Sequence, residues 1–179
     1  MKNLSDIDII SKILQGNADL FRLLVERYKE PVAAVIKNML GDCPEAEDVG
    51  QETFIRMYQS LAGFRGDASL KTYLIRIAMN LSLNEIKRIK KRNSRDLHID
   101  SGIQLKNIVE SSEIERAEIM EIIQKALNRL EIRQRSVFVL RIIEGFSTKE
   151  TSEILKIPVG TVLSRLSRAV EEMKKNVVL

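Results

Sequence analysis

Residues that build β-turns, disulfides and metal sites are scarce in this chain of 179 residues. Eight glycines and three prolines are too few for the frequent turns of an all-β protein. The single cysteine, Cys43, cannot form an intramolecular disulfide, and with the single histidine, His98, it cannot complete a zinc site of the usual Cys/His spacing. Without tryptophan, and with only 4% aromatic residues, any core must be aliphatic. The sequence therefore predicts an all-α fold with neither metal nor cofactor.

Long apolar runs are also lacking, and the first residues, MKNLSDIDII, are acidic after Lys2. This pattern predicts neither a signal peptide nor a membrane span. A lone cysteine fits a reducing compartment, so we expect a cytoplasmic protein. The net charge of +4 is modest, but residues 87–95 form a basic run without an acid and residues 110–121 are rich in glutamate. Such a distribution gives the chain one segment that attracts phosphate.

The strongest local pattern is in residues 147–175, which predict a helix-turn-helix. Ser147 and Glu150 have the spacing of a capping box, and residues 158–160 interrupt the apolar helical pattern between two short helices. The second helix has a polar face with two arginines one turn apart. Short side chains between arginines suit a helix in the DNA major groove, whereas the alternative is an ordinary helical hairpin with a solvated face. The residues of this face are Thr161, Ser164, Arg165, Ser167 and Arg168.

Helical periodicity before this segment predicts four helices, at residues 6–15, 19–40, 44–61 and 69–92. Pro31 falls inside the second, where we expect a bend or a lost hydrogen bond. Polar and apolar residues separate cleanly on the third and fourth helices. The stripes predicted to face inward are Ala46, Val49, Thr53, Phe54, Met57, Tyr58 and Leu61 on the third helix, and Leu70, Tyr73, Leu74, Ile77 and Leu81 on the fourth.

A polar ridge also follows the fourth predicted helix, where Arg76, Asn80, Asn84 and Arg88 recur every fourth residue. Asparagines flanked by basic residues suit base edges and phosphates, although a solvated helix face would have a similar pattern. Periodicity then fades, and residues 94–112 are interpreted as a flexible linker. The sequence thus predicts two small helical domains, at residues 1–93 and 113–179.

Two motifs in this order resemble the bacterial RNA polymerase sigma factors of the extracytoplasmic-function (ECF) group. The segment EAEDVGQETFIRMYQSLAGFRGDASLKTYLIRIAMNLSLNEIKRIKKR is similar to region 2 of that family and keeps its D-x-x-Q-E-x-F signature. The segment RQRSVFVLRIIEGFSTKETSEILKIPVGTVLSRLSRA is similar to region 4. The resemblance covers nearly the whole chain except the linker. The signature residues are Asp48, Gln51, Glu52 and Phe54.

The resemblance implies a sigma factor that binds core RNA polymerase and directs promoter-specific initiation, in a stress or envelope response. It implies no catalytic residue and no small-molecule substrate. The implied partners are the clamp helices and flap of core polymerase, promoter DNA and an anti-sigma factor. The residues implied to contact the clamp helices are Asp48, Gln51, Glu52, Ile55 and Arg56. Those implied for the minus-ten element, around a pocket for a flipped base, are Phe64, Arg65, Asp67, Ser69, Arg76, Asn80, Asn84 and Arg88. Those implied for the minus-thirty-five element are the five residues of the 147–175 polar face, from Thr161 to Arg168.

Three residues depart from the family pattern. Tyr73 stands where the family often has tryptophan, and Leu163 stands at a recognition-helix position that is often basic. Lys156 replaces the usual glycine of the turn, so a left-handed conformation there would cost about 1 kcal/mol.

Two other classes of protein remain as alternatives. A free-standing helix-turn-helix regulator would bind operator DNA tightly by itself. An adaptor or antagonist that only resembles a sigma factor would need no DNA surface, which the ridge and the arginine pair argue against.

Overall fold

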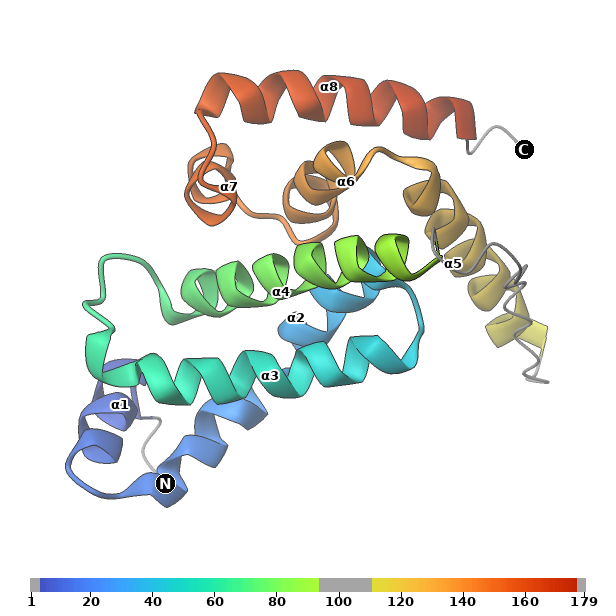
Figure 1. Ribbon diagram of the computed structural model, residues 1–179. Coiled ribbons are helices and arrows are strands. Elements are labelled where there is room, and N and C mark those ends of the chain that lie inside the picture. Colours follow the sequence, from blue (N-terminus) through green and yellow to red (C-terminus); the bar gives the residue numbers. More distant parts are fainter. Residues whose placement is uncertain (1–3, 94–110, 177–179) are drawn as a thin grey trace.

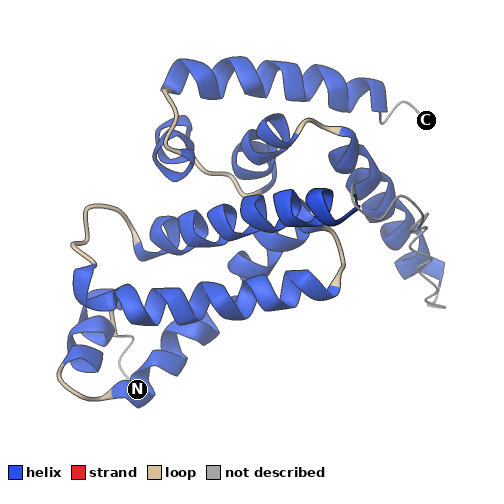
Figure 2. Ribbon diagram, viewed as in Figure 1, coloured by secondary structure: helices blue, strands red, loops and turns tan. Residues whose placement is uncertain are grey.

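The computed structural model describes the backbone of residues 4–93 and 111–176, and side chains within 4–92 and 119–176. Helices and short connections make up these ranges, with no strand in either, which confirms the predicted all-α class (Figure 2). The predicted linker lies outside the described residues as far as residue 110. Within the described part of the chain, no helix is long and apolar enough to cross a membrane.

The N-terminal half contains four α-helices around an aliphatic core. Leu24 and Ile36 of the second helix pack with Met57 of the third and Leu74 of the fourth, all at most 1% exposed. Pro31 lies within the second helix, as predicted, and Gly41 ends that helix at a φ of 84°, which favours glycine. The elements are α1 (Asp6–Leu14), η1 (Ala18–Leu20), α2 (Phe21–Leu40), α3 (Pro44–Ser60), η2 (Leu61–Gly63) and α4 (Leu70–Asn93).

The start of α1 is stabilised by contacts that were not predicted from the sequence. Ser5 and Asp8 form a capping box, and Asp6 accepts hydrogen bonds from Arg27 and Tyr28 of α2. Burial, followed by the hydrogen bond to Asp6, raises the pKa of Tyr28 to about 12. These contacts fix α1 against α2.

The C-terminal half contains α5 (Ser111–Arg129), α6 (Ile132–Phe138), α7 (Thr148–Leu155) and α8 (Val159–Asn176). A π-helical turn, η3 (Val139–Ile143), continues α6, whereas the sequence predicted one regular helix up to Gly145. A π-turn adds a residue to the helical repeat and so rotates the residues after it about the helix axis. Ile142, within this turn, is 53% exposed.

The two halves pack directly on each other through α4. In Figure 1, α4 lies between the layer of α2 and α3 and the layer of α6 and α7, with α8 outermost. Arg135 of α6 donates from Nη1 to the Met39 carbonyl of α2 at 2.9 Å, and the ammonium of Lys71 lies 5.0 Å from the centre of the Phe146 ring. Asn38 donates to Glu144 at 3.5 Å, and burial raises the pKa of that carboxyl.

This packing changes the predicted stripe of α4. Leu70, Leu74 and Leu81 are buried as predicted, but Ile75 and Met79, outside the stripe, are only 1% and 0% exposed. The reason is that α4 packs against α2, α3 and α7, whereas the sequence analysis assumed one buried side. The buried apolar residues of both halves form one continuous cluster.

Candidate functional site

The predicted helix-turn-helix is formed by α7 and α8. The Ser147 amide donates to Glu150 Oε2 at 2.8 Å, and the Glu150 amide donates to Ser147 Oγ at 3.2 Å, which confirms the capping box. Ile154 and Val162 are buried between the two helices and their neighbours. The Pro158 carbonyl accepts from the Thr161 amide at 2.9 Å and so begins α8.

Replacing Ser147 with alanine is expected to lower the free energy of unfolding by about 1 kcal/mol, because one amide of the first turn loses its acceptor. The Ser147 hydrogen bonds lower the pKa of Glu150. The contribution of this carboxylate is therefore complete above its unfolded pKa, near 4.5, and is lost as the pH falls through the lower folded value. Urea unfolding of the unchanged protein and of Ser147→Ala, at neutral and at acidic pH, gives the difference between their free energies of unfolding. This difference should be smaller at acidic pH. Ser167→Ala, on the exposed face of α8, should change stability by less than about 0.5 kcal/mol at either pH.

Lys156 joins the two helices in a left-handed conformation, with φ 52° and ψ 47°. It is the only non-glycine residue with positive φ among those described. The sequence analysis anticipated the strain that a side chain suffers in this conformation.

Lys156→Gly is therefore expected to raise the free energy of unfolding by about 1 kcal/mol, since the Cβ clash is removed. Thermal or urea unfolding gives the measurement. Lys149→Gly is the matched control, because Lys149 is an exposed lysine inside α7, where glycine should destabilise by about 1 kcal/mol. If both variants destabilise equally, the turn at Lys156 is not strained.

Helix α8 lies on the outer side of the C-terminal half, away from α4 (Figure 1). Ser164, Ser167 and Arg168 are exposed, whereas Thr161 and Arg165 are half-buried at the edge of the packed side. Val162, Ala169 and Met173 form that packed side. The predicted upstream-element residues thus divide into an exposed group and a half-buried pair.

A pocket of about 480 Å³ lies at the loop between α3 and α4. Phe64, Arg65, Asp67 and Arg76, predicted as minus-ten residues, all line it. Tyr73 also lines it, with its ring centre 5.3 Å from that of Phe64. Three predicted residues of the α3–α4 loop and one of α4 therefore line one pocket, which contains two aromatic rings and two guanidinium groups.

Two features of this pocket were not predicted. Glu153 of α7 also lines it, because the C-terminal half packs on α4. Arg76 is half-buried, and its Nε is buried without a hydrogen-bond partner. Both features depend on contacts between the two halves, which leave no local pattern in the sequence.

The other predicted minus-ten residues lie outside the pocket. Ser69 precedes α4 and accepts from the Thr72 amide at 3.1 Å, so it caps the helix. Asn80, Asn84 and Arg88 are exposed farther along α4, and Arg88 forms a 3.1 Å ion pair with Glu85. The ridge is therefore accessible at these three positions.

The exposed face of α3 carries the residues predicted to bind polymerase. Asp48, Gln51 and Arg56 are exposed, Glu52 forms a 2.6 Å ion pair with Arg56, and Ile55 is 49% exposed. Among the described side chains, no three His, Cys, Asp or Glu residues gather into a group that could hold a metal ion.

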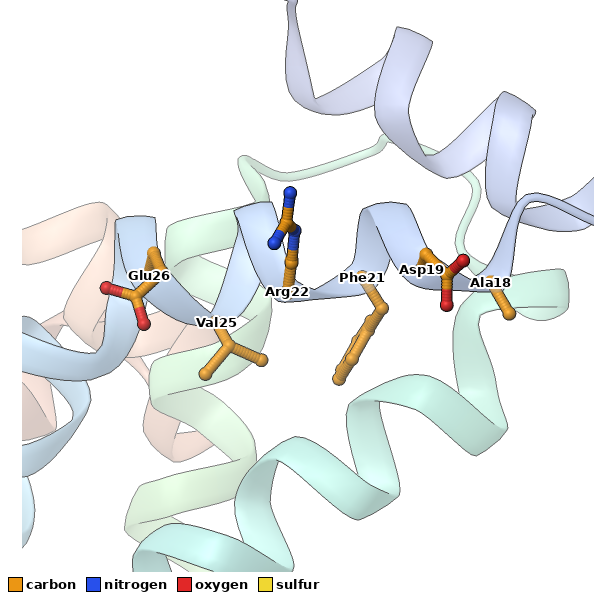
Figure 3. A pocket seen from close by; sticks show the side chains of 6 residues that line it. All are labelled: Ala18, Asp19, Phe21, Arg22, Val25 and Glu26. Carbon is orange, nitrogen blue, oxygen red and sulfur yellow. The ribbon is translucent and has the colours of Figure 1, made fainter.

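Tyr58 belongs to this exposed face, not to the inward stripe in which the sequence analysis placed it. Its side chain is 45% exposed, and its ring packs edge-on against Phe21 with the centres 4.9 Å apart. In Figure 3, Phe21 and Val25 point to the same side of α2, into an open depression that they line with Arg22. An aromatic ring at the edge of a stripe can pack on one flank and remain exposed on the other, which helical periodicity alone does not reveal.

Comparisons with known proteins agree with this arrangement. The Sigma-70 region 2 model matches residues 24–92, and the Sigma-70, region 4 model matches residues 120–173. The chain is 33% identical over 174 residues to the ECF RNA polymerase sigma factor SigW of Bacillus subtilis, covering 93% of each chain. It is also 33% identical to the ECF RNA polymerase sigma-E factor of Escherichia coli, covering 98% of this chain and 96% of that protein.

Solved structures show the same fold at lower identity. CnrH in complex with the cytosolic domain of CnrY matches with a TM-score of 0.67 and 23% identity over 93% of each chain. The sigma factor RpoE of Bartonella quintana, in complex with the anti-sigma factor NepR, matches with a TM-score of 0.68 and 23% identity over 88% of this chain and 96% of that chain. The sequence relatives establish the family: this chain belongs to the ECF group of sigma-70 factors, which direct transcription by RNA polymerase, and not to the free-standing helix-turn-helix regulators.

Proposed function

We propose that this chain binds core RNA polymerase through α3 and recognises a promoter with two separate DNA surfaces. The observation that carries the proposal is the pocket at the α3–α4 loop, where Phe64 and Tyr73 pair their rings beside Arg65 and Arg76. A lone regulator that reads duplex DNA with α8 has no use for such a pocket. A protein that holds an unpaired base does.

The polymerase-binding face consists of Asp48, Gln51, Glu52, Ile55 and Arg56, and we add Tyr58 to it. Ile55 and Tyr58 are exposed apolar side chains surrounded by charged and polar ones. This arrangement, an apolar centre with a polar rim, is typical of a protein interface. The clamp helices of the largest polymerase subunit are the proposed partner of this face, and the flap is the proposed partner of the C-terminal half.

The pocket is proposed to hold a flipped base of the minus-ten element. Removing a base from the duplex costs a few kcal/mol, which stacking on an aromatic ring and contacts to phosphate can recover. Phe64 offers the ring, and Arg65 and Arg76 offer positive charge, while Asp67 offers a hydrogen-bond acceptor. Ser69 supports the site by capping α4, and the unpaired strand continues along Asn80, Asn84 and Arg88.

The upstream element is proposed to bind α8. Arg168 and the short side chains Ser164 and Ser167 are exposed, so a major groove can approach them closely. Thr161 and Arg165, half-buried beside them, are placed to reach the DNA backbone.

The domain boundaries 1–93, 94–112 and 113–179 belong to the same proposal, with the first domain serving polymerase and the minus-ten element. The chain has no catalytic role of its own, since the polymerase performs the chemistry, and it acts in the cytoplasm. An anti-sigma factor is a proposed regulator, because CnrH and the Bartonella RpoE, which share the fold, are seen with CnrY and NepR. An envelope or stress response is the proposed setting.

In vitro transcription with core polymerase tests this function. The full chain and a bacterial core enzyme should together produce transcripts from a genomic template library, and their start sites should share two upstream motifs. Gln51→Ala is expected to weaken core binding without changing the motifs, because Gln51 is an exposed residue of α3. Gln59→Ala, near the end of the same helix and also exposed, tests whether the effect is local to the signature. No promoter-dependent transcript with any core enzyme would contradict the proposal.

A further inference from the structure

Two aliphatic side chains on α8 are exposed where a solvated helix face would carry polar ones. Leu163 is 53% exposed and Val159 is 45% exposed. They are four positions apart in the sequence, so they lie next to each other on the first two turns of α8. The core of the C-terminal half uses Val162, Ala169 and Met173 of the same helix and leaves this pair uncovered.

The residues around Val159 and Leu163 indicate what kind of molecule covers this pair. With 3.6 residues per turn, Leu163 and Arg168 flank a strip of Gly160, Ser164 and Ser167, all exposed. The small residues of the strip permit close approach of another molecule.

The charge of the surrounding segment favours a polyanion. Residues 154–170 contain no acid, while Lys156, Arg165 and Arg168 are basic; the flanking acids are Glu153 before the segment and Glu171 and Glu172 after it. The first half of α8 thus combines positive charge, small residues and an aliphatic pair, and acids begin only in its second half. A major groove offers negative charge with one type of apolar group at the base edges, the C5-methyl of thymine.

We infer that Leu163, with Val159 beside it, contacts thymine methyl groups in the major groove of the upstream element. Recognition at these positions therefore depends on a methyl group, and the upstream element carries thymine where the two side chains meet it. Leu163 is a specificity-determining residue in the position where the family pattern has a cation. The inference rests on the proposed binding of duplex DNA by α8 and adds which base chemistry is read there.

Deoxyuridine tests this directly, since it differs from thymidine only in the missing methyl. Duplexes are first selected from a random-sequence pool by the full chain in complex with core polymerase. Each thymine of the selected duplex is then replaced by deoxyuridine, one at a time. At the position that meets Leu163, the Kd should rise about fourfold, corresponding to about 0.8 kcal/mol for one buried methyl.

The variants identify the side chain responsible. In Leu163→Ala the deoxyuridine effect should disappear at one position and persist at the others, and Val159→Ser, which removes both γ-methyl groups, should remove it at a neighbouring base. Ile142→Ala is the matched control, because Ile142 is also 53% exposed but lies outside α8, and it should keep every effect. Leu163 is exposed, so its truncation leaves the fold intact.

The possible outcomes distinguish failure of the thymine-methyl contact from failure of the proposed DNA recognition by α8. Selection of a sequence whose binding tolerates deoxyuridine everywhere would overturn the methyl contact and leave duplex recognition by α8 in place. A deoxyuridine effect that survives both Leu163→Ala and Val159→Ser would overturn the methyl contact as well. If Leu163→Ala weakened core-polymerase binding instead, the pair would be a protein-docking surface. Failure to select any sequence would contradict upstream-element recognition itself.

Discussion

Arg168→Ala is expected to weaken binding to the upstream promoter element by about 1–3 kcal/mol, roughly a 5- to 150-fold rise in Kd. Arg168 is exposed beside Ser164 and Ser167 on the outer face of α8, so its guanidinium can reach a base edge or a phosphate without displacing a partner within the domain. Binding of the clamp helices to α3 should not change, because α3 lies on the opposite side of α4 from α7 and α8 (Figure 1).

Binding to a panel of duplexes over a range of salt concentrations distinguishes the two roles of Arg168. If it reads a base, the variant loses discrimination at one position; if it grips phosphate, all sequences weaken alike and the salt slope falls by about one. Arg129→Ala removes an exposed arginine from the end of α5 and serves as the control. Equal losses for Arg168→Ala and Arg129→Ala would show that α8 contributes only general charge.

Arg135→Ala is expected to lower the free energy of unfolding by about 1.5–3 kcal/mol, the range for a hydrogen bond from a charged group. Met39 is 0% exposed, and its carbonyl belongs to the last turn of α2, where no helical amide remains to pair with it. Arg135 donates to this carbonyl at 2.9 Å and also places a positive charge at the negative end of the α2 dipole. Its loss leaves a buried carbonyl without a donor.

Arg133→Ala provides the comparison, because Arg133 is an exposed arginine of the same helix whose contact with Glu131 is a loose 3.8 Å pair. Such a surface pair contributes about 0–1 kcal/mol. Urea unfolding of both variants at neutral pH gives the two free energies. Similar values for the two variants would mean that the contact from Arg135 to α2 contributes little to holding the halves together.

Local signals in the sequence predicted local structure well. The capping box of Ser147 and Glu150 depends on a few neighbouring residues and is confirmed, and Pro31 lies within α2 as predicted. Lys156 adopts the left-handed conformation whose cost was stated for it on the basis of the glycine in the family pattern. The gathering of Phe64, Arg65 and Arg76 around one pocket came from family resemblance, since periodicity does not report which loop side chains converge.

Long-range packing accounts for the features that the sequence did not reveal. Ile75 and Met79 are buried because α7 covers a second side of α4, and Glu153 lines the pocket for the same reason. Tyr58 satisfies the helical period of an inward residue, yet its ring finds a partner only in Phe21 and stays 45% exposed. The π-turn of η3, which contains Ile142, also left no signal in the sequence, because no composition rule marks the extra residue.

The hydrogen bond from Arg135 to the Met39 carbonyl also affects the order in which the fold is completed during synthesis. The two residues are 96 positions apart, so the end of α2 leaves the ribosome long before its donor has been synthesised. At about 5–20 residues per second, the interval is roughly 5–20 s. Helices α3 and α4 are synthesised within that interval, and both precede Arg135 in the chain. The docked arrangement of the two halves is therefore acquired late in synthesis, after α3, the proposed polymerase-binding helix, is complete.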